Sequence, residues 1–196
     1  MKRKQTIKLF IEGGLIVFSV LFALFIDRMA GDAKTNEQKR TSLTRIHKEL
    51  SENEKLIGEM IALHEVVIQS LNTAISSKED TLRRQIMQDG YLEYKLLANG
   101  RSLFPRYPSS TAWEAAKSTG IISEFDYETI EACTGAYATQ EMIVKGTLAK
   151  IIEDLFNIDY AQMDQKLIKL RLEFEEIRRQ EKTLQTRLEK AITMTK

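Results

Sequence analysis

The apolar run from Leu9 to Ile26 constrains this chain of 196 residues more than any other feature. It reads LFIEGGLIVFSVLFALFI and holds a single ionisable side chain, Glu12. Because an α-helix rises about 1.5 Å per residue, this run and its flanks are long enough to cross a hydrocarbon core of about 30 Å. The sequence therefore predicts a basic tail at residues 1–8 and a transmembrane helix at residues 9–27.

A cleaved signal peptide is the alternative interpretation of the same run. Its cleavage context would be Gly31-Asp32-Ala33, which is a poor match to the small-residue motif that signal peptidases recognise. The residues that follow are typical of a continuing helix. We therefore expect the segment to be retained as a membrane anchor.

Three residues of the predicted span, Glu12, Ser19 and Ala23, share one helical face because they are spaced by seven and four residues. Small residues on a shared face allow transmembrane helices to approach closely, so this face predicts self-association. In the alternative, Glu12 extends to the nearby membrane interface and the other two residues have no special role.

The span and a second stretch resemble a group of uncharacterised bacterial membrane proteins. The span fits their pattern at ten positions: Glu12, Leu15, Ile16, Val17, Val20, Leu21, Ala23, Leu24, Ile26 and Asp27. Ser19 replaces the usual glycine, and Arg28-Met29 stands where a tryptophan is common. The stretch TAWEAAKSTGIISEFDYETIEACTGAYATQE, residues 111–141, is similar to a W-x-x-x-x-x-x-G then D-Y pattern in the soluble part of that group. The resemblance implies an architecture and no activity.

The distribution of cations predicts the orientation in the membrane. Four cations precede the span and four follow it: Lys2, Arg3, Lys4, Lys8, then Arg28, Lys34, Lys39 and Arg40. The denser N-terminal cluster favours a cytoplasmic N-terminus. With the resemblance, this predicts a single-pass protein of the bacterial inner (cytoplasmic) membrane whose helical domain is periplasmic or extracellular.

Two long heptad patterns predict an all-α fold with an antiparallel coiled-coil hairpin. Only two prolines interrupt a chain rich in helix formers. Apolar residues alternate at spacings of three and four within an outgoing helix, residues 33–77, and within a returning helix, residues 158–194. Extra apolar residues on the outgoing helix indicate a third or fourth packed helix, and hence a three- or four-helix bundle.

One polar position in each seam predicts the register of the hairpin. If Leu43 pairs with Ala191, then Asn53 meets Glu181, and a matched polar pair in an apolar seam can fix register. In this register Leu50 lies opposite Leu184. In the alternative, each helix pairs with its own copy in an oligomer.

Residues 78–157 form the predicted helical head, with an irregular loop at residues 89–110. Thr111-Ala112-Trp113-Glu114 matches a capping box, so a helix should begin there and end at Gly120. A further helix is expected from residues 123–125 to about Asn157, covering the widened stripe of the outgoing helix.

No motif predicts catalysis, a metal site or a cofactor. The two histidines, His47 and His64, lack partners at metal-ligand spacing, and Cys133 has no histidine nearby in sequence. A formal net charge of +1 gives no general attraction to nucleic acid. We therefore expect a protein that is not an enzyme, with no cofactor and no nucleic-acid partner. An enzyme would need a site that only folding assembles.

One loop is a candidate for binding an anionic ligand or a partner. It interleaves arginines with aromatic residues, a combination suited to bidentate bonds and stacking. The candidate residues are Arg101, Phe104, Arg106, Tyr107 and Trp113. In the alternative, the aromatic residues close the end of the bundle while the arginines stay solvated.

The function predicted from these features is a non-enzymatic, membrane-anchored helical scaffold or interaction module that self-associates. Its partners would be the lipid bilayer and either further copies of the chain or another membrane protein. The alternative is an oligomeric membrane effector or channel component that responds to a ligand or partner at the head.

Overall fold

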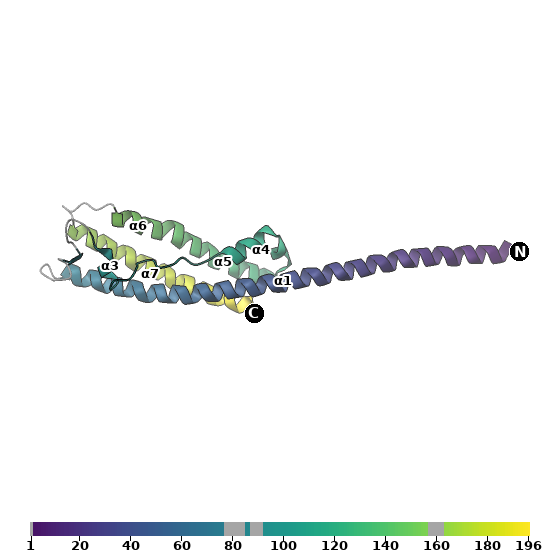
Figure 1. Ribbon diagram of the computed structural model, residues 1–196, viewed down its shortest axis with the longest axis horizontal. Helices are drawn as coiled ribbons and strands as arrows, with labels where there is room; N and C mark the ends of the chain where they lie inside the picture. The colour runs from purple at the N-terminus through teal and green to yellow at the C-terminus, as the bar shows by residue number, and fades with distance from the viewer. Residues whose placement is uncertain (1, 77–84, 87–91, 157–162) are drawn as a thin grey trace.

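The computed structural model describes residues 2–76, 85–86, 92–156 and 163–196. Every regular element in these ranges is helical, which confirms the predicted all-α class. The first helix, α1, runs from Lys2 to Ser76 over 75 residues (Figure 1). The predicted span and outgoing helix are thus one helix. The stretch between Ile26 and Lys34 contains no proline, and Gly31 is its one uncharged residue of poor helix propensity. Nothing in this stretch therefore ends the helix.

The N-terminal part of α1 extends beyond the other helices (Figure 1). Its large apolar side chains from Leu15 to Met29 are each 49–66% exposed. Among the described residues, α1 is the helix long and apolar enough to cross a membrane, and a signal sequence has the same properties. Because no other described part of the chain covers this surface, the core of the bundle does not include it.

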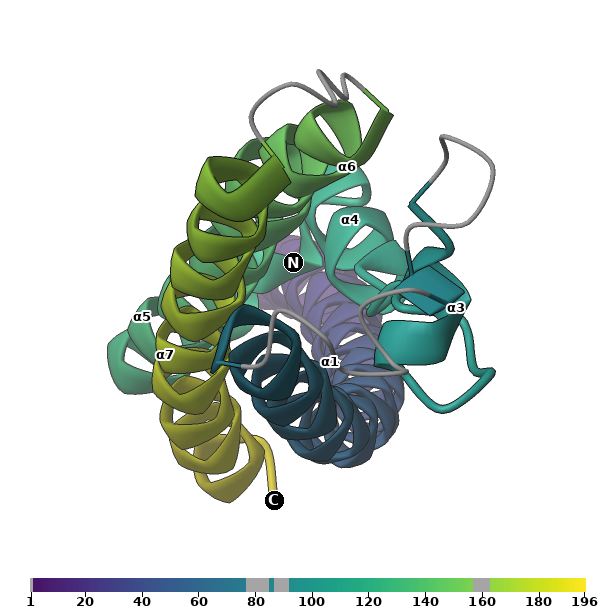
Figure 2. The ribbon, with the colours of Figure 1, turned by 90° about the vertical axis from the view of Figure 1, so that its left-hand side faces the viewer.

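The second long helix, α7, runs from Met163 to Met194 and packs antiparallel to α1 (Figures 1 and 2). Its buried side begins at Leu167 and repeats every three or four residues. All members of this stripe are fully buried: Leu167, Leu170, Phe174, Ile177, Glu181, Leu184, Leu188 and Ala191. α7 is the central helix, because α1, α5 and α6 all pack against it.

The predicted register of α1 and α7 is wrong. Glu181 lies opposite His64 rather than Asn53, and the neighbouring residues Glu65 and Arg178 form an ion pair. Near the other end, Thr195 bonds to His47, although the predicted register places Ala191 at Leu43. Relative to the prediction, α7 is shifted along α1 by about two to three helical turns. A heptad pattern permits such shifts because it repeats every seven residues.

The connection between the long helices contains the remaining elements. The predicted loop includes a short helix, α3 (Tyr94–Leu97), and is followed by α4 (Thr111–Ser118). As predicted, Gly120 follows this helix in the left-handed conformation, at φ 74°. The 3-10 helix η2 (Ile121–Glu124) then leads to α5 (Tyr127–Met142), whose first turn is capped by the Asp126 side chain through the Thr129 N–H, at 2.8 Å.

The last head helix continues as the π-helix η3 (Ile143–Leu148) and α6 (Ala149–Phe156). A π-helix holds more residues per turn, so it rotates the following side chains about the axis. Ile143 is buried in this turn, and Val144 is only half-buried. This helix packs on α7, and α3 packs on α1 (Figure 2).

Candidate functional site between α1, α4 and α5

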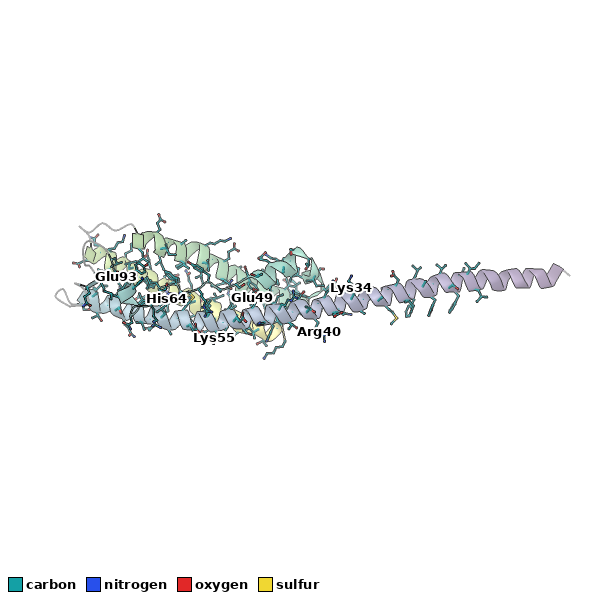
Figure 3. All side chains as sticks on the ribbon, in the orientation of Figure 1. Lys34, Arg40, Glu49, Lys55, His64 and Glu93 are labelled. Carbon is teal, nitrogen blue, oxygen red and sulfur yellow. The ribbon has the colours of Figure 1, made fainter. Side chains whose placement is uncertain are left out.

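The buried carboxylate of Glu49 joins three segments at the end of the bundle nearest the apolar part of α1 (Figure 3). It accepts hydrogen bonds from the Ala112 N–H at 3.0 Å and the Trp113 N–H at 3.4 Å, so it caps α4 from outside that helix. It also accepts from the Ser109 hydroxyl at 2.7 Å and the Tyr137 hydroxyl at 2.8 Å. One side chain of α1 thereby holds the loop, α4 and α5 together.

The predicted capping box does not form. Thr111 is the first residue of α4, no side chain of its N-cap Ser110 caps the helix, and Glu114 instead pairs with Lys117 at 2.7 Å. The carboxylate of Glu49 already satisfies the free N–H groups of the first turn. A local capping pattern is therefore replaced by a contact across more than sixty residues.

The side chain of Asn53, one turn after Glu49, binds the backbone of the same loop. Its amide donates to the Ser109 carbonyl at 2.7 Å and accepts from the Ser109 N–H at 2.9 Å. It also donates to Gln140 at 3.1 Å, and Gln140 in turn donates to the Pro108 carbonyl at 3.2 Å. Asn53 therefore does have a polar partner in the core, but the partner is α5 and the loop rather than Glu181.

A groove between α4 and α5 lies beside this network. Its volume is about 650 Å³, and its floor includes the stacked rings of Trp113 and Tyr137, whose centroids are 5.5 Å apart. Its rim carries both positive and negative side chains, in the ion pairs Glu114–Lys117 at 2.7 Å and Glu141–Lys145 at 2.6 Å. Burial, together with the hydrogen bond to Glu49, raises the pKa of Tyr137 far above its ordinary value, so its hydroxyl stays protonated. The groove can accept a partner of mixed charge, while the Tyr137 hydroxyl in its floor is already bonded to Glu49.

A second buried polar cluster lies farther along α1, around His64 (Figure 3). The His64 Nδ1 is 2.9 Å from Glu181 Oε2, and its Nε2 is 3.2 Å from the Leu103 carbonyl oxygen. Both side chains are fully buried, and the imidazole ring lies edge-on to Phe104 and Phe174. Both ring nitrogens therefore face acceptor oxygens, which fix the orientation of the buried imidazole.

The five loop residues predicted to form a ligand site have different neighbours. Phe104 stacks on Phe174 in the core, and Trp113 stacks on Tyr137 at the groove. Arg106 lies 3.6 Å from Glu59 in a solvent-exposed pair, and Arg101 donates to the Ala98 carbonyl. Tyr107 is 55% exposed. Phe104 and Trp113 therefore pack on the bundle, whereas Arg106 and Tyr107 are exposed to solvent.

Of the predicted span interface, the structure describes the side chains of Ser19 and Ala23. The Ser19 hydroxyl donates to its own Leu15 carbonyl at 2.8 Å, and both Ser19 and Ala23 are exposed. The side chain of Glu12 lies outside the described part of the structure.

Within the described ranges, no group of three or more His, Cys, Asp or Glu side chains could hold a metal ion. Burial raises the pKa of the Cys133 thiol to about 12, so the reactive thiolate is suppressed. Sequence reasoning missed Glu49 and the His64–Glu181 pair. The sequence around Glu49, His64 and Glu181 is ordinary for a helix. Their hydrogen-bond partners lie far away in the sequence, so no local pattern reveals them.

Comparisons with protein-family models, with curated proteins and with solved structures find no match to this chain.

Proposed function

We propose that this chain is a membrane-anchored, non-enzymatic helical scaffold that presents its bundle close to the bilayer surface. The observation that carries the proposal is the unbroken helix α1, which has an exposed apolar segment at one end and the bundle at the other. A helix without a break transmits the position of its membrane segment to the bundle with little freedom. A tether with a flexible linker would not do so.

The short distance between the apolar segment and the bundle supports this role. Met29 is the last exposed large apolar residue of α1. The bundle begins seven or eight residues later, where Asn36 lines a groove with Thr195 and Glu37 lines one with η2. Seven or eight residues of helix correspond to about 11 Å. The bundle would therefore stand near the lipid headgroups rather than far from the membrane.

The finer localisation is part of the proposal. The basic N-terminal cluster favours a cytoplasmic N-terminus, and the resemblance to bacterial membrane proteins favours the inner membrane with the bundle outside the cytoplasm. Protease treatment of spheroplasts tests this orientation: the bundle should be digested from outside. Protection of the bundle until the membrane is lysed would reverse the proposed topology.

Self-association through the span is the second part of the proposal. Ser19 and Ala23 are exposed on one side of α1, and the Ser19 hydroxyl is satisfied within the helix, so both act as small surface residues. At 100° per residue, Leu21 lies on the opposite side of the helix. This gives a matched control on the same segment.

Cysteine crosslinking in membranes tests this interface. In a Cys133→Ser background, Ser19→Cys and Ala23→Cys should form disulfide-linked dimers, and Leu21→Cys should form few. Equal crosslinking at all three positions, or none, would contradict self-association through this face. Ion conductance in liposomes that contain the purified protein would favour the channel alternative over a scaffold.

A further inference from the structure

Two carboxylates of the bundle are buried side by side without enough hydrogen-bond donors. Asp154 of α6 and Glu173 of α7 have side chains that are 16% and 12% exposed. Three of their four oxygens, Asp154 Oδ2 and both oxygens of Glu173, are buried and have no hydrogen-bond partner among the described residues. Lys169 donates to the fourth, Asp154 Oδ1, at 2.7 Å, and its Nζ is 3.8 Å from Glu173 Oε1.

This arrangement is unfavourable when both carboxylates are ionised. Buried acceptors without donors cost free energy, and two adjacent negative charges repel each other. A single proton removes both penalties, because a protonated Glu173 can donate to the Asp154 carboxylate. A pair coupled in this way holds one proton between its members over a range of pH.

The charges around the pair do not replace that proton. On α7 they are Lys166 and Lys169, and on α6 they are Lys150 and Glu153. Burial, and then the neighbouring Asp154, raise the pKa of Glu173 to about 7 in spite of these lysines. Conversely, a protonated Glu173 that donates to Asp154, and then the hydrogen bond from Lys169, lower the pKa of Asp154. The proton therefore resides on Glu173.

We propose that Asp154 and Glu173 form a proton-operated latch between α6 and α7. In the closed latch, Glu173 keeps its proton and donates it to the Asp154 carboxylate. When the O–H bond of Glu173 breaks, the proton passes to water and leaves two buried carboxylates side by side, and α6 separates from α7 to hydrate them. The latch lies toward the end of the bundle remote from the apolar segment (Figure 1), so it changes the outer part of the bundle and leaves the Glu49 network closed.

The sign of the pH response follows from the two states of the chain. The pKa of Glu173 is near 4.5 when the chain is unfolded and about 7 in the bundle, so folding retains a proton between these values. The stabilisation is fully present below about pH 4.5. It is lost as the pH rises through 7.

Hydrogen exchange of the α6 amides in the full chain, reconstituted in nanodiscs, tests the latch. After correction for the intrinsic rate, exchange should accelerate with pH by up to about tenfold per unit between pH 4.5 and 7, because at most one proton is lost. Glu173→Gln should abolish this dependence, since the amide mimics the protonated acid. Glu176→Gln is the matched control: this carboxylate of the same helix pairs with Arg179, which lowers its pKa, so the response should remain.

Carbon NMR of the glutamate carboxyls supplies a second readout that does not depend on the Gln variant folding. Glu173 should titrate near neutral pH in the native chain, and Asp154→Asn should shift that titration to lower pH by removing the repelling charge. Titration of Glu173 at its ordinary value, or a titration unaffected by Asp154→Asn, would refute the latch. A Glu173→Gln variant that folds and keeps the native pH response would refute it as well.

Discussion

At the residue scale, Glu49 is the side chain whose loss should disturb the most segments. Glu49→Ala removes the acceptor of two α4 N–H groups and of the Ser109 and Tyr137 hydroxyls, and it leaves the Tyr137 hydroxyl buried. We expect a loss of about 2–4 kcal/mol in the free energy of unfolding. Thermal and denaturant unfolding of the full chain in detergent would measure it.

Glu52→Ala is the control for that substitution. Glu52 lies about one turn from Glu49 on the same helix, but its side chain is 70% exposed. It forms a surface ion pair with Lys48 at 3.8 Å. Its removal should change stability by less than about 0.5 kcal/mol. Equal effects of the two substitutions would show that the Glu49 network does not hold α4.

The His64–Glu181 pair should show strong coupling. Either single change, His64→Leu or Glu181→Leu, leaves one buried polar partner unmatched, so each should cost about 3–5 kcal/mol. The double variant replaces both partners by apolar side chains of similar size and should recover most of that loss. Additive losses in a double-mutant cycle would contradict a direct interaction.

Individual side-chain roles were the part of this protein least accessible from sequence. Asn53 and Glu181 were recognised as polar positions within apolar seams, and both are indeed buried. Their partners were not recognised, because Gln140 and Ser109 reach Asn53 only after the head folds back along α1. Glu49 carries no local signal, since a glutamate between Ile46 and Leu50 on a helix is normally solvated.

At the element scale, the register of α1 and α7 gives a direct prediction. The side chains of Glu54 and Gln185 are bonded at 3.1 Å. In a Cys133→Ser background, cysteines at 54 and 185 should therefore react with a short thiol crosslinker. Cysteines at 54 and 180 lie opposite each other only in the register predicted from the heptad pattern, so this pair should not react. The opposite result would restore the register predicted from sequence.

Helix positions were predicted well at this scale because they depend on local chemistry. Heptad spacing marks the buried stripe of α7, and Gly120 ends the helix that begins at Thr111. The register was not predictable in the same way, because a repeating apolar pattern is nearly unchanged by a shift of seven residues. The buried pair His64–Glu181 and the ion pair Glu65–Arg178 break this degeneracy, and both are contacts between distant segments.

At the scale of the whole molecule, the decisive property is that α1 has no break between the apolar segment and the bundle. A helix of this kind fixes both the distance and the rotation of the bundle relative to the span. Ala33 lies in the exposed part of α1 between the apolar segment and the bundle, so it is part of the continuous helix but not of the core. It is therefore the position at which continuity can be removed without disturbing the bundle.

Ala33→Pro should kink or break α1, because proline removes a backbone donor and clashes with the preceding turn. Spin labels at Ile16→Cys and Lys182→Cys, in a Cys133→Ser background, should give a narrow distance distribution in the unsubstituted helix and a broad one with Ala33→Pro. Ala33→Leu should keep the narrow distribution, since leucine favours helix. The unfolding of the bundle should change by less than about 0.5 kcal/mol in both variants, because residue 33 is exposed. If the starting helix already gives a broad distribution, α1 does not act as a rigid connection, and a scaffold that depends on fixed placement loses its physical basis.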